Sequence, residues 1–83
     1  MAIADEMCDR LAAMHPTEVE VRDDSERHRG HAGWREGGET HFHIRLRAPE
    51  LAGLSRLARH RRVHEVLGAD LVGRIHALSL DLG

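Results

Sequence analysis

The chain has 83 residues, of which 41% are hydrophobic and 31% are charged, and its formal net charge is −2. This length fits a single domain over 1–83, and the composition excludes a disordered chain. No apolar run is long enough to cross a membrane and the N-terminus has no secretory pattern, so we expect a cytoplasmic, bacterial protein.

Charge is distributed unevenly along the chain. Residues 1–26 contain eight acidic residues and two arginines, whereas residues 27–64 contain nine arginines and three acidic residues. The basic middle can face an anionic surface, but the near-neutral total argues against an obligate nucleic-acid-binding protein.

Hydrophobic spacing predicts a helix at the N-terminus, because Ile3, Met7, Leu11 and Met14 recur at helical intervals before Pro16. Residues 17–23 alternate between valine and charged residues, which predicts a strand. Residues 24–38 have no period and contain four glycines, so we expect a long loop, and loops of this length are often functional.

Alternation resumes over 39–47 and predicts a half-buried strand with Phe42, Ile44 and Leu46 inward. A helix over 55–67 follows, with Ser55 as candidate cap and Leu57 on its apolar side, then an extra turn over 68–73 and a strand over 74–82. The order αββααβ predicts an α+β fold, a three-stranded mixed sheet with helices packed on one face.

Histidine is unusually frequent, with copies at 15, 28, 31, 41, 43, 60, 64 and 76. His28 and His31 lie in the glycine-rich loop, where an imidazole can reorient toward a metal or simply be solvated. His76 shares strand alternation with the leucines at 78, 80 and 82, so we expect it at the head of a buried row.

His41 and His43 are two residues apart on the predicted strand 39–47, so their side chains project in parallel. Such a pair can chelate a metal, although it more often lines a polar sheet face. We therefore expect both imidazoles at the surface.

The helix 55–67 carries a basic stripe that suits phosphate contacts or a solvated surface. The candidate phosphate-binding residues are Arg56, Arg59, Arg61 and Arg62. No glycine-rich phosphate loop and no HExxH motif occur, and acidic neighbours would raise the pKa of Cys8, the single cysteine. We therefore expect no enzyme activity.

Four short segments occur in a characteristic order. They are Ser25 with Gly-His-Ala-Gly at 30–33, Glu-Thr-His-Phe at 39–42, the segment 53–63 that includes Arg-His-Arg-Arg, and Ile-His-Ala-Leu-Ser-Leu at 75–80. Together they resemble the BolA family over about residues 3–82. The resemblance implies a fold similar to class II KH domains.

The resemblance also implies a partner and a cofactor. BolA-like proteins pair with monothiol glutaredoxins, and the heterodimer can hold a [2Fe-2S] cluster that glutaredoxin ligates through its cysteine and glutathione. By position the ligands here are His76 and His31, with His28 as the alternative loop ligand. The isolated chain is expected without a cluster, as a monomer or weak homodimer, and a family link to transcription makes DNA the alternative partner, through helix 55–67.

Overall fold

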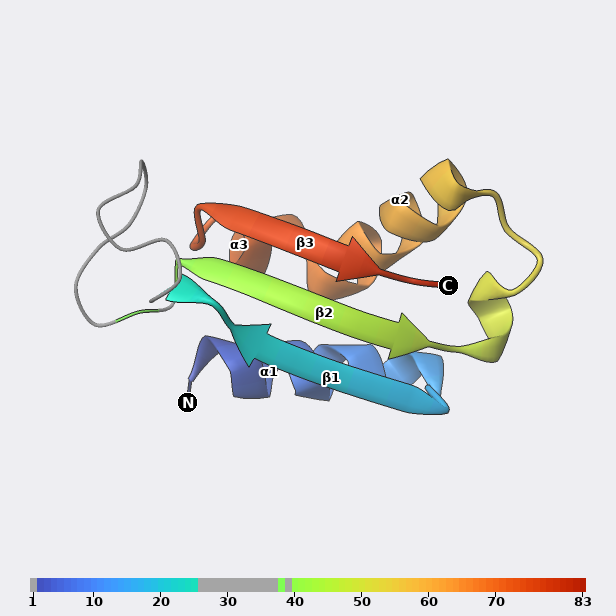
Figure 1. Cartoon of the computed structure of the whole chain (residues 1–83), viewed down its shortest axis with the longest axis horizontal. Helices are drawn as coiled ribbons and strands as arrows, with labels where there is room; N and C mark the ends of the chain where they lie inside the picture. The colour runs from blue at the N-terminus through green and yellow to red at the C-terminus, as the bar shows by residue number, and fades with distance from the viewer. Residues whose placement is uncertain (1, 26–37, 39) are drawn as a thin grey trace.

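The computed structural model of this chain describes residues 2–25, 38 and 40–83. Its elements, in chain order, are α1 Ile3–Leu11, a 3₁₀ turn Ala12–Met14, β1 Glu18–Asp23, β2 His41–Arg47, a 3₁₀ turn Pro49–Leu51, α2 Arg56–Leu67, α3 Ala69–Val72 and β3 Ala77–Asp81 (Figure 1). This order confirms the predicted αββααβ arrangement.

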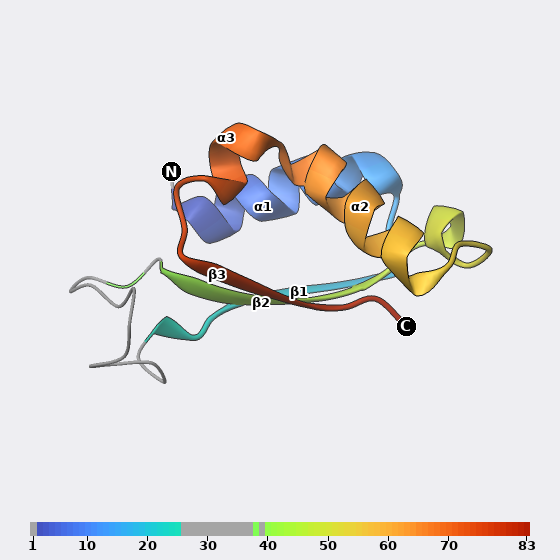
Figure 2. The same cartoon turned by 90° about the horizontal axis from the view of Figure 1, so that it is seen from above.

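The three strands form one mixed sheet in the order β1-β2-β3. β2 runs antiparallel to β1 and parallel to β3, so that Ile44 lies between Val21 and Leu80. All three helices pack against the same face of the sheet, as Figure 2 shows, and no helix of the described residues covers the other face. The predicted α+β class and sheet type are therefore confirmed.

The hydrophobic core lies between that sheet face and the helices. α1 contributes Met7 and Leu11, β2 contributes Ile44 and Leu46, and α2 contributes Leu67, all fully buried. The remaining buried apolar residues are Ile3, Met14, Phe42, Ala48, Leu51, Val63, Leu71 and Leu82. β2 is the central strand, and one of its faces lies against the core. Apolar and polar residues therefore alternate most clearly along this strand.

Local signals set the ends of two helices as predicted. His15 takes a left-handed backbone conformation with φ of 51° directly before Pro16, and this reversal ends the first helix. At the start of α2, the Ser55 hydroxyl accepts a 3.2 Å hydrogen bond from the Ala58 amide, which confirms the predicted cap.

The expected burial of Leu57 is wrong, because its side chain is 62% exposed. The buried residues of α2 are Val63 and Leu67. Leu57 precedes Val63 by six residues, which places the two side chains about 120° apart around a helix of 3.6 residues per turn. Leu57 therefore lies outside the buried stripe of α2 and is exposed.

Arg10 of α1 joins the first helix to the junction between α2 and α3. Its guanidinium makes two 3.0 Å hydrogen bonds to the Asp70 carboxylate and also donates to the backbone oxygen of Leu67. These hydrogen bonds lower the pKa of Asp70 to about 2.

We expect Asp70→Asn to reduce the loss of folding stability that accompanies a fall in pH. The folded pKa of Asp70 lies below its ordinary value of 3.8, so the pair stabilises the fold above that value and loses its contribution as the pH falls from about 4 to 2. Urea unfolding at pH 7, 4 and 2 measures the difference, with Asp5→Asn on α1, the helix that carries Arg10, as a control. Parallel stability curves for Asp70→Asn and the wild type would contradict the expectation.

Candidate metal-ligand site at the base of the long loop

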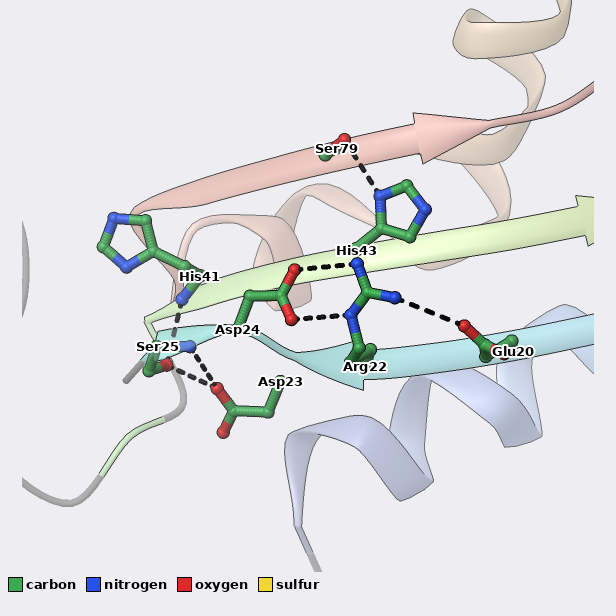
Figure 3. Close-up of polar contacts among 8 residues, drawn as sticks. All are labelled: Glu20, Arg22, Asp23, Asp24, Ser25, His41, His43 and Ser79. Carbon is green, nitrogen blue, oxygen red and sulfur yellow. Dashed lines mark hydrogen bonds and ion pairs between the residues drawn. The ribbon is translucent and has the colours of Figure 1, made fainter. Parts of the chain in front are cut away.

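Ser25 ties together the two ends of the long loop. Its hydroxyl accepts hydrogen bonds from the amides of Thr40 at 2.9 Å and His41 at 3.2 Å, and it lies 2.5 Å from the Asp23 carboxylate, to which it donates. Figure 3 shows part of this network where β1 and β2 begin to diverge. Ser25 is 1% exposed and Thr40 is fully buried, so this polar cluster is an internal part of the fold.

His76 lies next to the same loop base. Its backbone amide and that of Ala77 both donate to the Thr40 carbonyl oxygen, at 2.9 and 3.0 Å. The expected position of His76 in a buried row is wrong, because β3 begins only at Ala77 and the His76 side chain is exposed. Arg74 and Ile75 still hydrogen-bond back to α3, so the chain joins the sheet later than alternation predicts.

The His41 imidazole is buried against His76. Its side chain is 5% exposed, its Nδ1 lies 2.8 Å from the Thr40 hydroxyl oxygen, and its ring centroid lies 5.3 Å from that of His76. The expectation that His41 lines a polar surface is therefore wrong. It differs from His43 because Ser25, Thr40 and His76 surround the end of β2.

His43 follows the expectation for an open sheet face. Its Nδ1 lies 3.0 Å from the Ser79 hydroxyl across β2 and β3 (Figure 3). Ion pairs follow the same face: Arg22 with Glu20 and Asp24, Arg45 with Glu18, and Arg47 with Asp81. The charges of this face are thus largely paired within the sheet.

The two predicted loop ligands, His28 and His31, lie outside the described residues. The loop leaves the sheet at Ser25 and returns at Thr40, and both of these residues are described. Since Thr40 is bonded to Ser25 and to the amide of His76, the loop begins and ends beside His76.

Arg59, one of the four predicted phosphate-binding residues, is occupied by the protein backbone. Its guanidinium donates to the carbonyl oxygens of Leu54 at 3.0 Å, Ala52 at 3.2 Å and Leu82 at 3.4 Å. It thereby links the start of α2 to the segment after β3. Three of its five N–H groups are thus already used, so Arg59 is less available for the predicted contact than an arginine without such bonds.

The other three arginines differ in their engagement. Arg62 pairs with Glu50 at 3.3 Å and with Glu65 at 3.4 Å. Arg56 and Arg61 are exposed, and their guanidinium groups make no hydrogen bond or ion pair with another residue in the described part of the chain. Of the predicted stripe, these two are best placed to contact an anionic partner.

Cys8 is exposed on α1 and its surroundings disfavour the thiolate. Partial burial of the thiol raises its pKa, and the carboxylates of Asp5 and Asp9 raise it further. A raised pKa lowers the population of the nucleophilic form. The prediction that acidic neighbours blunt Cys8 is confirmed in direction, although burial is the larger cause.

Sequence reasoning missed the contribution of Ser25, Thr40 and His41 to the site. Asp23 and Ser25 did contain a local signal, because an aspartate two residues before a serine can accept its amide, here at 2.9 Å. The contact between Ser25 and Thr40 spans fifteen residues, so no local pattern predicts it.

The fold and the site define a small α+β domain with an exposed histidine at the loop end of its sheet. The chain belongs to the BolA-like protein family, whose model matches residues 11–83. It is 38% identical over 72 residues to a Sinorhizobium sp. protein named for its place in the cobS 5′ region, covering 86% of this chain and 77% of that one.

A mouse relative and a solved plant structure agree with this membership. The chain is 40% identical over 68 residues to BolA-like protein 1 of Mus musculus, covering 82% of this chain but 47% of the mouse protein. The BolA domain of SufE1 from Arabidopsis thaliana matches with a TM-score of 0.78 at 32% identity, covering 95% of this chain and 87% of that one. The chain thus spans about half the length of the mouse protein.

The sequence predicts that no segment is long and apolar enough to cross a membrane. None of the helices in the described ranges has the length and apolar character that a membrane span requires.

Proposed function

We propose that this protein binds a monothiol glutaredoxin and co-ligates a [2Fe-2S] cluster in the heterodimer. His76 supplies one ligand, and His31, or alternatively His28, supplies the second. The chain itself is not an enzyme in this proposal and acts in cluster trafficking or in iron-responsive and redox-responsive regulation. The observation that carries the proposal is the exposed His76 imidazole at the point where the long loop begins and ends.

The metal-binding side chains in the described part of the chain can supply part of the ligands of such a cluster, but not all of them. Residues 2–25, 38 and 40–83 contain no group of three or more His, Cys, Asp or Glu side chains placed to hold a metal ion. At the loop end of the sheet, the exposed donor is His76, with His41 buried behind it. A cluster that needs four ligands would therefore depend on the loop and on a partner.

The number of residues between Ser25 and each predicted loop ligand limits how far that ligand can lie from the loop base. His31 is six residues from Ser25 and His28 is three, and an extended chain covers at most about 3.6 Å per residue. The reach is therefore about 20 Å for His31 and about 10 Å for His28. These values are upper limits on the distance between Ser25 and each imidazole, and they do not choose between the two histidines.

Two residues of the chain position the proposed ligand. Thr40 holds the backbone of His76 through its carbonyl oxygen, and His41 limits the space available to the His76 ring. Histidine ligands on one iron, as in Rieske centres, give a cluster with a higher potential than thiolates alone. In this proposal the chain presents an imidazole from a backbone position that Thr40 holds.

Anaerobic co-expression with a monothiol glutaredoxin tests the proposal. The two proteins should co-purify as a brown heterodimer that contains iron and sulfide and has visible [2Fe-2S] absorption. The isolated chain, purified in the same way, is the control and should be colourless. Failure to co-purify, or a colourless complex after supply of iron and sulfide, would contradict the proposal.

DNA binding by α2 is a second candidate, favoured by the exposure of Arg56 and Arg61. If it occurs, log affinity should fall with log salt at a slope of about −0.9 for each phosphate neutralised, and Arg56→Gln with Arg61→Gln should flatten the slope by about two such units. Fluorescence anisotropy with a DNA duplex measures it, and Arg62→Gln is the matched control because Arg62 is already paired. Binding without salt dependence would remove this candidate.

A further inference from the structure

Two histidines of α2 share one hollow on the surface of the helical layer. His60 is half-buried and His64 is exposed, and both line a hollow between α2 and α3. Apolar Ala69 and Val72 and the backbone at Gly73 form the α3 side of this hollow. These imidazoles lie on α2, whereas the proposed cluster ligands lie at the loop end of the sheet.

The spacing of His60 and His64 suits a chelate. Residues four apart on a helix lie on one face with about 5–6 Å between their Cβ atoms. Two histidines at this spacing hold one zinc ion in the helical HExxH motif, so the distance allows both imidazoles to contact a single cation. Neutral imidazole is a ligand that suits Zn²⁺, Cu²⁺ and Ni²⁺.

The side chains of His60 and His64 are not committed to other contacts. Neither makes a side-chain hydrogen bond or ion pair with another residue in ranges 2–25, 38 and 40–83. His43, in contrast, bonds to Ser79 at 3.0 Å. The two α2 imidazoles therefore have nitrogens available for a ligand.

The charges at the hollow are mixed. Arg61 and Glu65 also line it, and Glu65 is shared with Arg62 at 3.4 Å. The carboxylate beside His64 is therefore shared with Arg62, and Arg61 has no ion-pair partner in the described part of the chain. No third His, Cys, Asp or Glu completes a metal group in the described part of the chain, which limits the protein ligands to two.

We propose that His60 and His64 form a two-histidine site for one borderline divalent cation, Zn²⁺ or Cu²⁺, with water in the remaining positions. The bound ion cross-links successive turns of α2 and so stabilises that helix. Cu²⁺ binds more tightly than Zn²⁺, following the general order of affinities at nitrogen sites. The site is independent of glutaredoxin and of the proposed cluster.

Titration of Zn²⁺ into the full chain, followed by calorimetry, tests the site. A parent variant with His28→Ala, His31→Ala and His76→Ala removes the candidate cluster ligands, so that the remaining tight binding reports on α2. In this parent, His60→Ala and His64→Ala should each weaken Zn²⁺ binding by about tenfold or more. Removing a residue that merely hydrogen-bonds to a metal ligand already lowers metal affinity by about tenfold, and removing the ligand itself should lower it at least as much. His15→Ala is the matched control and should leave the affinity unchanged.

A spacing variant separates chelation from the mere number of histidines. His64→Ala with Glu65→His keeps both imidazoles but places them five residues apart, and it should bind as weakly as His64→Ala. In the wild-type chain, proton NMR should show Zn²⁺ shifting the ring signals of His60 and His64 together. Equal binding by the parent and either single variant, or full binding by the spacing variant, would overturn the proposal.

Discussion

Ser25→Ala is expected to lower the free energy of unfolding by about 2–4 kcal/mol. The substitution removes the acceptor of two amides, those of Thr40 and His41, and the hydroxyl that donates to Asp23. Each buried polar group left without its partner costs about 1–3 kcal/mol, and Ser25 is 1% exposed. Urea unfolding with circular dichroism measures the change.

Ser79→Ala is the matched control for Ser25→Ala. Ser79 is an exposed serine of β3 whose hydroxyl contacts only the His43 ring among the described residues. Its removal should change stability by less than about 0.5 kcal/mol, as is usual at the surface. If Ser25→Ala were as mild as Ser79→Ala, the polar cluster at the loop base would not stabilise the fold as described.

His76→Ala is expected to remove most of the visible cluster absorption from the heterodimer with glutaredoxin. The substitution deletes the exposed imidazole but keeps the backbone amide that donates to Thr40, so the fold should remain intact. Stability of the isolated chain should change by about 0.5 kcal/mol or less. Absorption and iron content of the co-purified complex measure cluster binding. Circular dichroism of the isolated chain measures folding, so the two together separate loss of a ligand from loss of the fold.

His43→Ala is the control for a histidine on the same sheet, and it should leave the colour unchanged. Single variants His31→Ala and His28→Ala then identify the loop ligand, since only the true ligand should reproduce the loss seen with His76→Ala. Full absorption in a variant that lacks His76, His31 and His28 together would contradict the proposed ligands.

Much of the fold could be predicted because local chemistry specifies it. The alternation in β2, the reversal at His15 and Pro16, and the Ser55 cap all act within a few residues. The start of β3 could not be predicted in this way. Alternation in the sequence continues to Arg74, but the strand begins where Ala77 pairs with His41, a contact that depends on the whole sheet.

Burial of single side chains was the least predictable part of the site. His41 and His43 have the same alternation, yet His41 is buried and His43 only half-buried, because His76 from another segment packs against the His41 ring and the adjacent Thr40 contacts it. Arg59 and Arg56 look alike in the sequence, and the difference between them arises from carbonyl oxygens in Ala52, Leu54 and Leu82. Such differences come from tertiary neighbours.

The closed base of the loop has a consequence for how this protein can diverge. Since Ser25 and Thr40 join the two ends inside the fold, a change in loop length need not alter the sheet. Doubling the length of a flexible loop costs only about 0.6 kcal/mol in closure entropy. Changes in the number of residues between Ser25 and Gly38 therefore cost little in closure entropy, and the donor residues available beside His76 can change while the Ser25–Thr40 contact is kept.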